Sequence, residues 1–325
     1  MLNFKPSFTA ITCIISTLTC FLFLALYVNH GFITFAQFPV GLRITTHRRY
    51  EEIERTPNEF INPLMRSEAS FQTAYKYICT SDKEKYDMIK RVDFENQTGE
   101  FLRSLFHKLI SNPVGGRCAN LQRFGGRYIQ RCHYWDGHKF VCMPELINDI
   151  GNNECVVYSF GISNDWSFEK AMGKIGCKVF AFDPTVDHPK ELEENVWFEK
   201  LGLSVEKDEA RSLDSLSSIL HTYGHKNTKI SYLKIDIEGG EADGLQHWFE
   251  SEALANVQQI GMEYHIKDTD SAVKFFTAIK QLHVEANFRL ISFDVNGCYG
   301  KEKADYPKLA EIVLMRSSEN SFCAD

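Results

Sequence analysis

The chain has 325 residues, of which 44% are hydrophobic and 13% aromatic, so it holds enough apolar material for one large domain and an appendage. This composition excludes a disordered chain. The net charge of -7 at pH 7 argues against broad nucleic-acid binding, because a protein that covers phosphates needs a basic face.

The first segment, residues 1–30, has the features of a signal anchor. Residues 8–28 contain no charged side chain, and about 20 apolar residues span a bilayer as a transmembrane helix. Lys5 precedes this stretch, whereas the first arginine after it is Arg43, which favours a cytoplasmic amino terminus. We therefore expect a single-pass type II membrane protein of the secretory pathway, with its remainder in the lumen of the ER or Golgi. The alternative is a signal peptide cleaved near residues 34–36, followed by secretion.

Cysteine usage agrees with an oxidising compartment. The chain has ten cysteines; two lie inside the apolar segment, and the others form an even set that can pair. Cys155 and Cys177 precede or open predicted core strands, and we expect buried free thiols there. No Cys-x-x-Cys pair is present, so a structural zinc site is the weaker interpretation. Asn96 begins a glycosylation sequon that is usable in the lumen, which predicts a glycoprotein.

Two segments separate the anchor from the main domain. Residues 31–64 are polar and are predicted to form a stem or linker. Residues 65–150 are predicted to form an accessory region, helical at first and then rich in cysteine, glycine and aromatic residues. In its second part, Asp136 precedes a glycine that signals a turn, so Cys132 and Cys142 are expected to flank a hairpin.

From about residue 151 the pattern changes to strands alternating with helices. Residues 156–162 predict a buried strand that ends at Gly161, with a helix at 166–175 behind it. This turn has one glycine, so the three-glycine dinucleotide fingerprint is absent and NAD is disfavoured. The next strand ends at Asp183, at a spacing that suits a carboxylate bound to ribose hydroxyls. Alternatively, Asp183 merely opens an Asp-Pro turn.

The alternation continues to about residue 318 and leaves a tail at 319–325. A strand followed by a helix, repeated along the chain, implies a parallel sheet, and the last two strands are close enough in sequence to form an antiparallel pair. The further predicted elements are strands at 196–204, 230–237, 257–265, 288–295 and 309–315, and helices at 213–223, 242–254 and 271–286.

Acidic side chains gather where the strand at 230–237 ends. Asp236 and Glu238 are two residues apart, so they leave the strand on the same side, and Glu241 falls in the first turn of the next helix. Ligands of open α/β sheets bind at the carboxyl ends of the strands, so these carboxylates could line a pocket. The plainer interpretation is that Asp236 pairs with Lys234 and that Glu241 only favours its helix dipole.

Five short motifs follow one another along the chain: Tyr158–Ile162, Phe182–Pro184, Leu213–Leu216, Leu233–Glu241 and Glu263–His265. Together they resemble the FkbM-type S-adenosylmethionine-dependent methyltransferases. With the apolar first segment and the cysteine-rich stretch, the resemblance is more specifically to the methyltransferase-like protein 24 family, over about residues 115–315. It implies a seven-stranded, doubly wound, mostly parallel Rossmann-like sheet, S-adenosylmethionine as methyl donor, and an oxygen acceptor, often on a sugar.

The resemblance also implies where the donor would lie. Phe160, Gly161 and Ser163 would contact its methionine part, and Asp183 would hold its ribose. The acidic block after the fourth strand, Asp236 and Glu238, would complete the donor site. The first motif lacks the second glycine that many methyltransferases carry there.

The predicted catalytic residues are Asp236, Glu263 and His265. If the fourth and fifth strands are neighbours, they bring these side chains and Glu238 to one point at the carboxyl end of the sheet. We expect His265 to be the general base, because an ordinary histidine pKa near 6.5 lets it take a proton near neutral pH. The alternative is that the set binds Mg²⁺ or Mn²⁺, which would lower the pKa of the acceptor hydroxyl. We favour the metal-free version.

The partners expected are the membrane, through residues 8–28, and a hydroxyl acceptor on a small molecule, glycan or protein, with no nucleic acid. Two other classes of function are considered. A non-catalytic lumenal scaffold would keep the fold without turnover, and a dehydrogenase or glycosyltransferase would use another nucleotide. The missing glycines argue against the dehydrogenase, and nothing in the sequence independently supports a nucleotide-sugar site.

Overall fold

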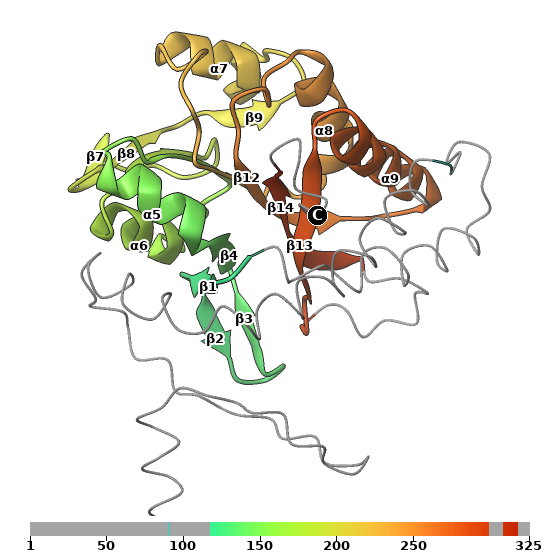
Figure 1. Cartoon of the computed structure of the whole chain (residues 1–325), viewed down its shortest axis with the longest axis horizontal. Helices are drawn as coiled ribbons and strands as arrows, with labels where there is room; N and C mark the ends of the chain where they lie inside the picture. The colour runs from blue at the N-terminus through green and yellow to red at the C-terminus, as the bar shows by residue number, and fades with distance from the viewer. Residues whose placement is uncertain (1–90, 92–117, 299–307, 318–325) are drawn as a thin grey trace, which may run out of the picture. The chain divides into compact units, whose positions relative to one another are not determined.

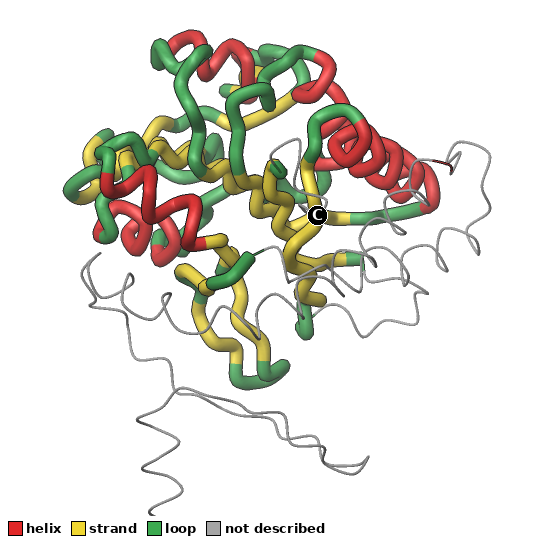
Figure 2. The backbone as a smooth tube through the Cα atoms, viewed as in Figure 1, coloured by secondary structure: helices red, strands yellow, loops and turns green. Residues whose placement is uncertain are grey.

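The computed structural model describes residues 91, 118–298 and 308–317. The predicted anchor at 8–28, the stem, the sequon at Asn96 and the first accessory helices all lie outside the described residues. Within the parts that are described, none of the helices combines the length and the apolarity needed to cross a bilayer. The described part is a mixed sheet with helices on both of its faces (Figures 1 and 2).

The central sheet confirms the predicted doubly wound architecture. The strands from β12 to β8 run parallel, whereas β14 is antiparallel to both of its neighbours, as expected for the closing pair. The short antiparallel edge strand β7 adds one strand to the seven that were predicted. In spatial order the strands are β13 (Phe288–Val295), β14 (Leu309–Arg316), β12 (Gln259–His265), β11 (Tyr232–Ile235), β5 (Val156–Phe160), β6 (Lys178–Phe182), β8 (Val196–Glu199) and β7 (Glu191–Glu193).

The inner strands are apolar on both faces because helices cover both. Side chains alternate along β5, so Tyr158 and Phe160 pack into one core and Val157 into the other. The first core also contains residues of α7 (Leu216–Thr222), α8 (Glu241–Glu250) and α9 (Thr269–Val284). The second contains residues of α5 (Met143–Gly151) and α6 (Ser167–Lys174). The carboxyl ends of the parallel strands therefore lie between two helical layers.

A bent hairpin precedes the sheet. It pairs β1 (Leu121–Phe124) with β4 (Lys139–Cys142), and β2 (Arg127–Ile129) with β3 (Tyr134–Asp136). The turn lies at residues 130–133, so the predicted turn at Asp136 was wrong. The following residue, Gly137, instead adopts φ 76° and bends the chain between β3 and β4.

The hairpin covers the part of the sheet that α5 and α6 leave open. Strand β4 packs against β12 and β14. The hydroxyl of Tyr232 donates a 2.7 Å hydrogen bond to the carbonyl of Phe140. The side-chain amide of Gln259 accepts from the N–H of Cys142 at 2.8 Å and donates to its carbonyl at 2.9 Å, as a neighbouring strand would. The second half of the predicted accessory region is thus fixed to the sheet.

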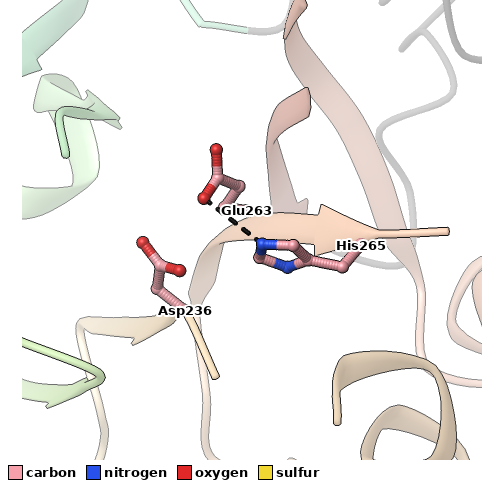
Figure 3. A group of neighbouring side chains, drawn as sticks. All are labelled: Asp236, Glu263 and His265. Atoms are coloured by element: carbon pink, nitrogen blue, oxygen red, sulfur yellow. Dashed lines mark ion pairs between the residues drawn. The ribbon is translucent and has the colours of Figure 1, made fainter. Parts of the chain in front are cut away.

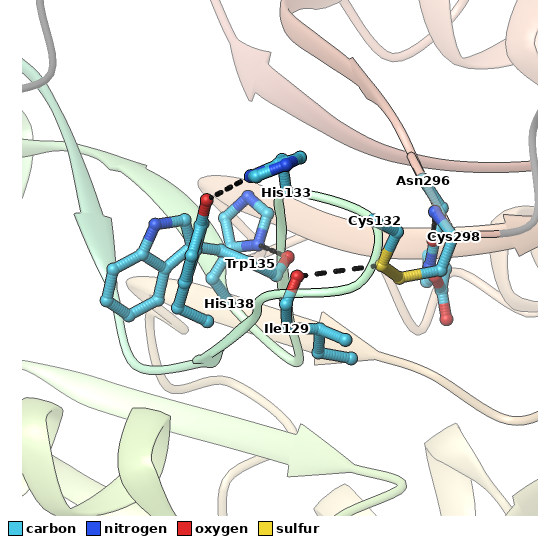
Figure 4. Close-up of a disulfide and its surroundings, with 9 residues drawn as sticks. Ile129, Cys132, His133, Trp135, His138, Asn296 and Cys298 are labelled. Carbon is cyan, nitrogen blue, oxygen red and sulfur yellow. Dashed lines mark hydrogen bonds between the residues drawn. A yellow bond between two sulfur atoms is a disulfide. The ribbon is translucent and has the colours of Figure 1, made fainter.

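Two disulfides hold the hairpin. Cys118 bonds to Cys142 at its base, and Cys132 at its tip bonds to Cys298 beyond β13 (Figure 4). Cys132 and Cys142 do lie on a hairpin, as expected, but each has a distant partner. The bond to Cys298 spans 166 residues of sequence, and no local pattern could have indicated it.

A third disulfide, Cys155–Cys177, corrects the expectation of free thiols at these positions. The two residues directly precede β5 and β6. These strands are parallel neighbours in the register Val156 to Lys178, so the cysteines stand side by side. The pairing follows from the adjacency of these two parallel strands.

The region after β8 departs from prediction. The expected strand at 196–204 divides into β8 and β9 (Gly202–Ser204), and a 3-10 turn at Glu209–Arg211 follows. The expected helix at 213–223 begins with β10 (Leu213–Ser215), which pairs in parallel with β9. Helix α7 starts only after Ser215, whose hydroxyl accepts from the N–H of Ser218 at 3.3 Å.

Replacing both Cys155 and Cys177 with alanine should lower the free energy of unfolding by about 2–4 kcal/mol, because the unfolded chain loses a covalent constraint. Urea unfolding followed by circular dichroism measures this loss. Peptide mapping of the unreduced wild type should recover the cross-linked pair. Free thiols at both positions would contradict the assignment.

Candidate functional site

The ends of three neighbouring strands meet at Gly161. The N–H of Gly161 donates to the carbonyl of Phe182 at 3.0 Å, and the N–H of Asp236 donates to the carbonyl of Phe160 at 3.0 Å. A Cβ atom on Gly161, which has φ 79°, would lie 1.6 Å from the carbonyl oxygen of Asp236. Only glycine allows this approach of one backbone to another. The side chain of Phe160 stacks on Phe182 in the core, so only its backbone faces this turn.

Asp183 fixes the turn that follows Gly161. Its Oδ2 accepts from the N–H groups of Ile162 and Ser163, both at 2.8 Å, and its Oδ1 accepts from the N–H and hydroxyl of Thr185 at 2.7 and 2.6 Å. Burial alone would raise the pKa of Asp183, but these hydrogen bonds outweigh it and lower the pKa below its ordinary value. Both carboxylate oxygens of Asp183 thus accept hydrogen bonds from the protein. A contact with ribose would require one of these bonds to be exchanged, so the predicted ribose contact stays a prediction. Ser163 has an exposed side chain and a left-handed φ of 51°.

Lys234 also stabilises the turn at Gly161. Its Nζ donates to the carbonyl of Gly161 at 2.7 Å and lies 3.4 Å from Oε1 of Glu169, which also accepts from the hydroxyl of Ser159 at 2.6 Å. The plainer interpretation, in which Lys234 pairs with Asp236, is therefore wrong. Glu169 was not predicted from the sequence. The one available indication was that an acidic residue lies on the inward face of the amphipathic helix α6.

The predicted catalytic residues come together (Figure 3). Asp236 follows β11, whereas Glu263 and His265 lie on β12, its parallel neighbour. The two β12 residues are two positions apart, so they share a face of the sheet. One ligand atom from each of the three residues lies within 4.8 Å of the others.

His265 is held between carboxylates. Its Nδ1 lies 3.2 Å from Oε1 of Glu241, and its Nε2 lies 3.4 Å from Glu238 and 3.7 Å from Glu263. Burial alone would lower its pKa, but the hydrogen bond and charge of Glu241, with the charges of Glu263 and Asp236, raise the pKa to about 9. At neutral pH the imidazole is therefore protonated in this arrangement. The expectation that His265 is a free base, which assumed a pKa near 6.5, needs correction.

The loop between β11 and α8 presents these groups. Glu238 and Gly239 have φ 58° and 109°, and this left-handed pair turns the chain sharply. Glu238 leaves its side chain 86% exposed. Glu241 is buried, and its Oε1 accepts from the N–H of Ile237 at 2.9 Å. Glu241 thus positions His265, beyond any effect on its helix dipole.

Sequence reasoning missed the groups that close the other side of the cluster. Lys139 of β4 is fully buried, with Nζ 2.7 Å from Oε1 of Glu311 and 3.4 Å from Oδ2 of Asp236. Asn296 donates from Nδ2 to Oε1 of Glu263 at 2.9 Å. A lysine inside an apolar stretch was the one signal available for Lys139. Its partners are far away in sequence.

The charges of this cluster perturb one another. Burial raises the pKa of Glu311 to about 8, with Lys139 opposing the shift and Glu263 and Asp236 adding to it. Burial and the charge of Asp236 also raise the pKa of Glu263. The pKa of Lys139 rises despite burial because Glu311 and Asp236 stabilise its charged form. The cluster is therefore rich in carboxylates relative to the positive charge that faces them.

Comparison with known proteins identifies the domain. The sequence pattern of the family described as "Methyltransferase domain" matches residues 113–306. A human relative described as "Probable methyltransferase-like protein 24" is 30% identical over 173 residues, 46% of each chain. A rat relative with the same description is 28% identical over 171 residues, 46% of this chain and 47% of the relative. The matched region spans about half the length of these curated relatives. The resemblance carried by the motifs is confirmed.

Solved structures also show similarities. An rRNA methylase from Streptococcus thermophilus has a TM-score of 0.31 and 12% identity, covering 55% of this chain and 96% of that one. A candidate tRNA (m1A22) methyltransferase from Streptococcus pneumoniae, in complex with S-adenosyl-L-methionine, has a TM-score of 0.30 and 14% identity, covering 54% and 74%. These scores are too low to carry any argument.

Gly161→Ala should abolish native folding or leave a strongly destabilised protein, because its Cβ would overlap the carbonyl oxygen of Asp236. Gly224→Ala is the matched control: Gly224 has φ 72° and nothing within 4 Å of an added Cβ, so only backbone strain of about 1 kcal/mol is expected. Thermal unfolding of both variants measures the difference. Equal melting temperatures would refute the backbone contact.

Asp183→Asn should lower the free energy of unfolding at pH 7 by about 1–3 kcal/mol, because an amide cannot accept all the bonds that the carboxylate accepts. The folded-state pKa lies below the ordinary value of 3.8, so the stabilising effect of Asp183 is complete above that value. It is lost as the pH falls through the folded-state pKa. Urea unfolding at several pH values should show the difference shrinking below about pH 4. A difference that stays constant with pH would contradict this assignment.

Proposed function

The chain belongs to the methyltransferase domain family, and from that premise we propose that it transfers the methyl group of S-adenosylmethionine to an acceptor hydroxyl. One observation carries the proposal. The turn at Gly161 touches the backbone of Asp236, whose carboxylate forms a cluster with Glu263 and His265. The turn that we assign to the donor and the cluster that we assign to the acceptor are therefore joined through one residue.

The residues at the strand ends fit such a donor. The bend at Gly161 leaves no room for a side chain, and the next residues are fixed by Asp183. We assign the backbone of Phe160 and Gly161, with Ser163, to the methionine part of the donor. Asp183 and Glu238 are assigned to its polar groups. The donor would supply a methyl group on a sulfonium; an acceptor oxygen takes the methyl group and loses its proton, while the carbon–sulfur electron pair stays on sulfur.

The cluster would act on the acceptor. Asp236, Glu263 and His265 point their polar atoms at one place, so the protonated imidazole can donate a hydrogen bond to a hydroxyl oxygen while a carboxylate accepts the hydroxyl proton. The hairpin and the helix layers flank this cluster, and Lys139 is fully buried beside it. Alignment of the acceptor and removal of its proton are the two tasks that methyl transfer to oxygen demands of a protein.

We further propose that the reaction takes place in the secretory pathway, with a glycan as one candidate acceptor. Three disulfides among the described residues support an oxidising compartment. The apolar stretch at 8–28 would anchor the chain as a type II membrane protein, or direct its secretion after cleavage.

His265→Ala should reduce methyl transfer about 100-fold or more, while the affinity for S-adenosylmethionine changes by only a few-fold. Transfer of labelled methyl groups to a lumenal extract measures turnover, and titration calorimetry measures donor binding. Mass spectrometry of the purified chain should also find a co-purifying adenosyl ligand.

His221→Ala is the control, because His221 lies exposed on α7 and away from the cluster. Unchanged turnover in His265→Ala would remove His265 from the mechanism. An absence of binding heat with the wild-type chain would favour the non-catalytic scaffold over the enzyme.

A further inference from the structure

We infer that Asp236, Glu263 and His265 bind one divalent cation, and that Mn²⁺ fits their donor set better than Mg²⁺ or Ca²⁺. Their ligand atoms lie within 4.8 Å of one another. A cation bound at about 2.0–2.2 Å separates opposite ligands by up to about 4.4 Å, so side-chain shifts of a few tenths of an ångström close the site. Glu238, whose Oε2 is 3.4 Å from Nε2 of His265, can supply a further oxygen.

The imidazole is oriented as a metal ligand requires. Glu241 accepts at Oε1 from Nδ1 of His265, which fixes the tautomer and turns Nε2 towards Asp236 and Glu263. Glu241 is itself fixed, because the same oxygen accepts from the N–H of Ile237. A carboxylate that holds the far nitrogen of a histidine is the usual outer support of a metal-bound imidazole.

The two carboxylates have the same kind of support. Asn296 holds Oε1 of Glu263, while Oε2 of Glu263 is the oxygen that faces Nε2 of His265 at 3.7 Å. Lys139 holds Oδ2 of Asp236, so Oδ1 is left for the ion. Each of the three ligands thus has one atom fixed by the protein and another directed at the shared point (Figure 3).

Buried polar atoms beside the cluster have no partner. Glu311 lies directly opposite Glu263 in the β12–β14 pairing and is 3% exposed, yet its Oε2 makes no hydrogen bond. Oε2 of Glu241, which is 1% exposed, also lacks a partner, as does the hydroxyl of Tyr134, which is 7% exposed. Such groups are costly to bury unsatisfied. A water bound to a cation beside Glu263 would give Oε2 of Glu311 a hydrogen-bond partner.

The donor set selects among cations. Two carboxylates and one imidazole favour a hard ion that also accepts nitrogen, and Mn²⁺ meets both conditions better than Mg²⁺ or Ca²⁺, which prefer oxygen alone. Its role rests on the proposed function: the ion would bind the acceptor oxygen and lower the pKa of the hydroxyl. The acceptor oxygen would take the methyl group and give up its proton to water, while the carbon–sulfur electron pair would stay on the sulfur of the donor.

Electron paramagnetic resonance of Mn²⁺ tests the site on the full chain. After EDTA treatment and buffer exchange, titration with Mn²⁺ should suppress the free-ion signal up to one ion per chain. Spin-echo modulation of bound Mn²⁺ should reveal the nitrogen of an imidazole ligand. No bound ion in the wild type, or bound Mn²⁺ without a nitrogen ligand, would overturn the inference without recourse to any variant.

Variants locate the ion. Asp236→Asn should weaken Mn²⁺ binding at least about 100-fold, and Glu241→Gln, which alters only the support of His265, about 10- to 100-fold. Asp243→Asn is the matched control: Asp243 pairs with Lys274 on the exposed side of α8 and should leave binding unchanged. Equal binding in Asp236→Asn and in this control would refute the site.

The two proposals fail separately. Mn²⁺ binding is measured without donor or acceptor, whereas donor binding is measured by calorimetry in EDTA. A chain that binds S-adenosylmethionine but no Mn²⁺ would refute the cation and keep the methyltransferase. A chain that binds Mn²⁺ at Asp236 but does not bind S-adenosylmethionine would keep the cation site and refute the methyltransferase.

Discussion

The acidic cluster depends on the ion pairs of one buried group, the ammonium group of Lys139. It lies between Glu311 on β14 and Asp236 after β11, and it comes from β4 of the hairpin. The carboxylates of Glu311 and Asp236 repel each other in the interior of the protein, where the polarity is low. A positive charge therefore has to be supplied from inside the protein. The hairpin is therefore part of the site: without it, the face of the sheet that carries Glu263 would lose both its cover and its counter-charge.

The same balance of charges explains the behaviour of His265. In water an imidazole is mostly neutral at pH 7, but among Glu241, Glu263 and Asp236 it holds its proton. The proton on His265 adds a second positive charge to that of Lys139 among these carboxylates. Exchange of that proton for a metal ion would leave the ring neutral and oriented. The function of the residue thus depends on its neighbours more than on its type.

Much of the arrangement could be predicted because it follows from local pattern. The apolar strands, their turn residues and the order of strand and helix fix a doubly wound sheet, and neighbouring strands bring Asp236 to Glu263 and His265. Other features depend on contacts between distant segments: Lys139 with Glu311, and Cys132 with Cys298. The disulfide between Cys155 and Cys177 is an intermediate case. Its two strands were predicted from local pattern, and the pairing follows once these strands are placed side by side. The predicted strand at 196–204 is divided because its second part, β9, pairs with β10. The sequence of this segment does not reveal that pairing.

The cross-link at the hairpin tip also sets an order of maturation. Cys298 follows Asn296 by two residues, its N–H donates to Oδ1 of Asn296 at 3.0 Å, and Asn296 holds Glu263. Cys132 emerges from the ribosome 166 residues before its partner, so this bond forms only when nearly the whole domain has been synthesised. Of the three disulfides among the described residues, this one is completed last in synthesis, and it fastens the loop that positions Glu263. A chain truncated before Cys298 would lose both this cross-link and β14, the strand that joins β13 to β12.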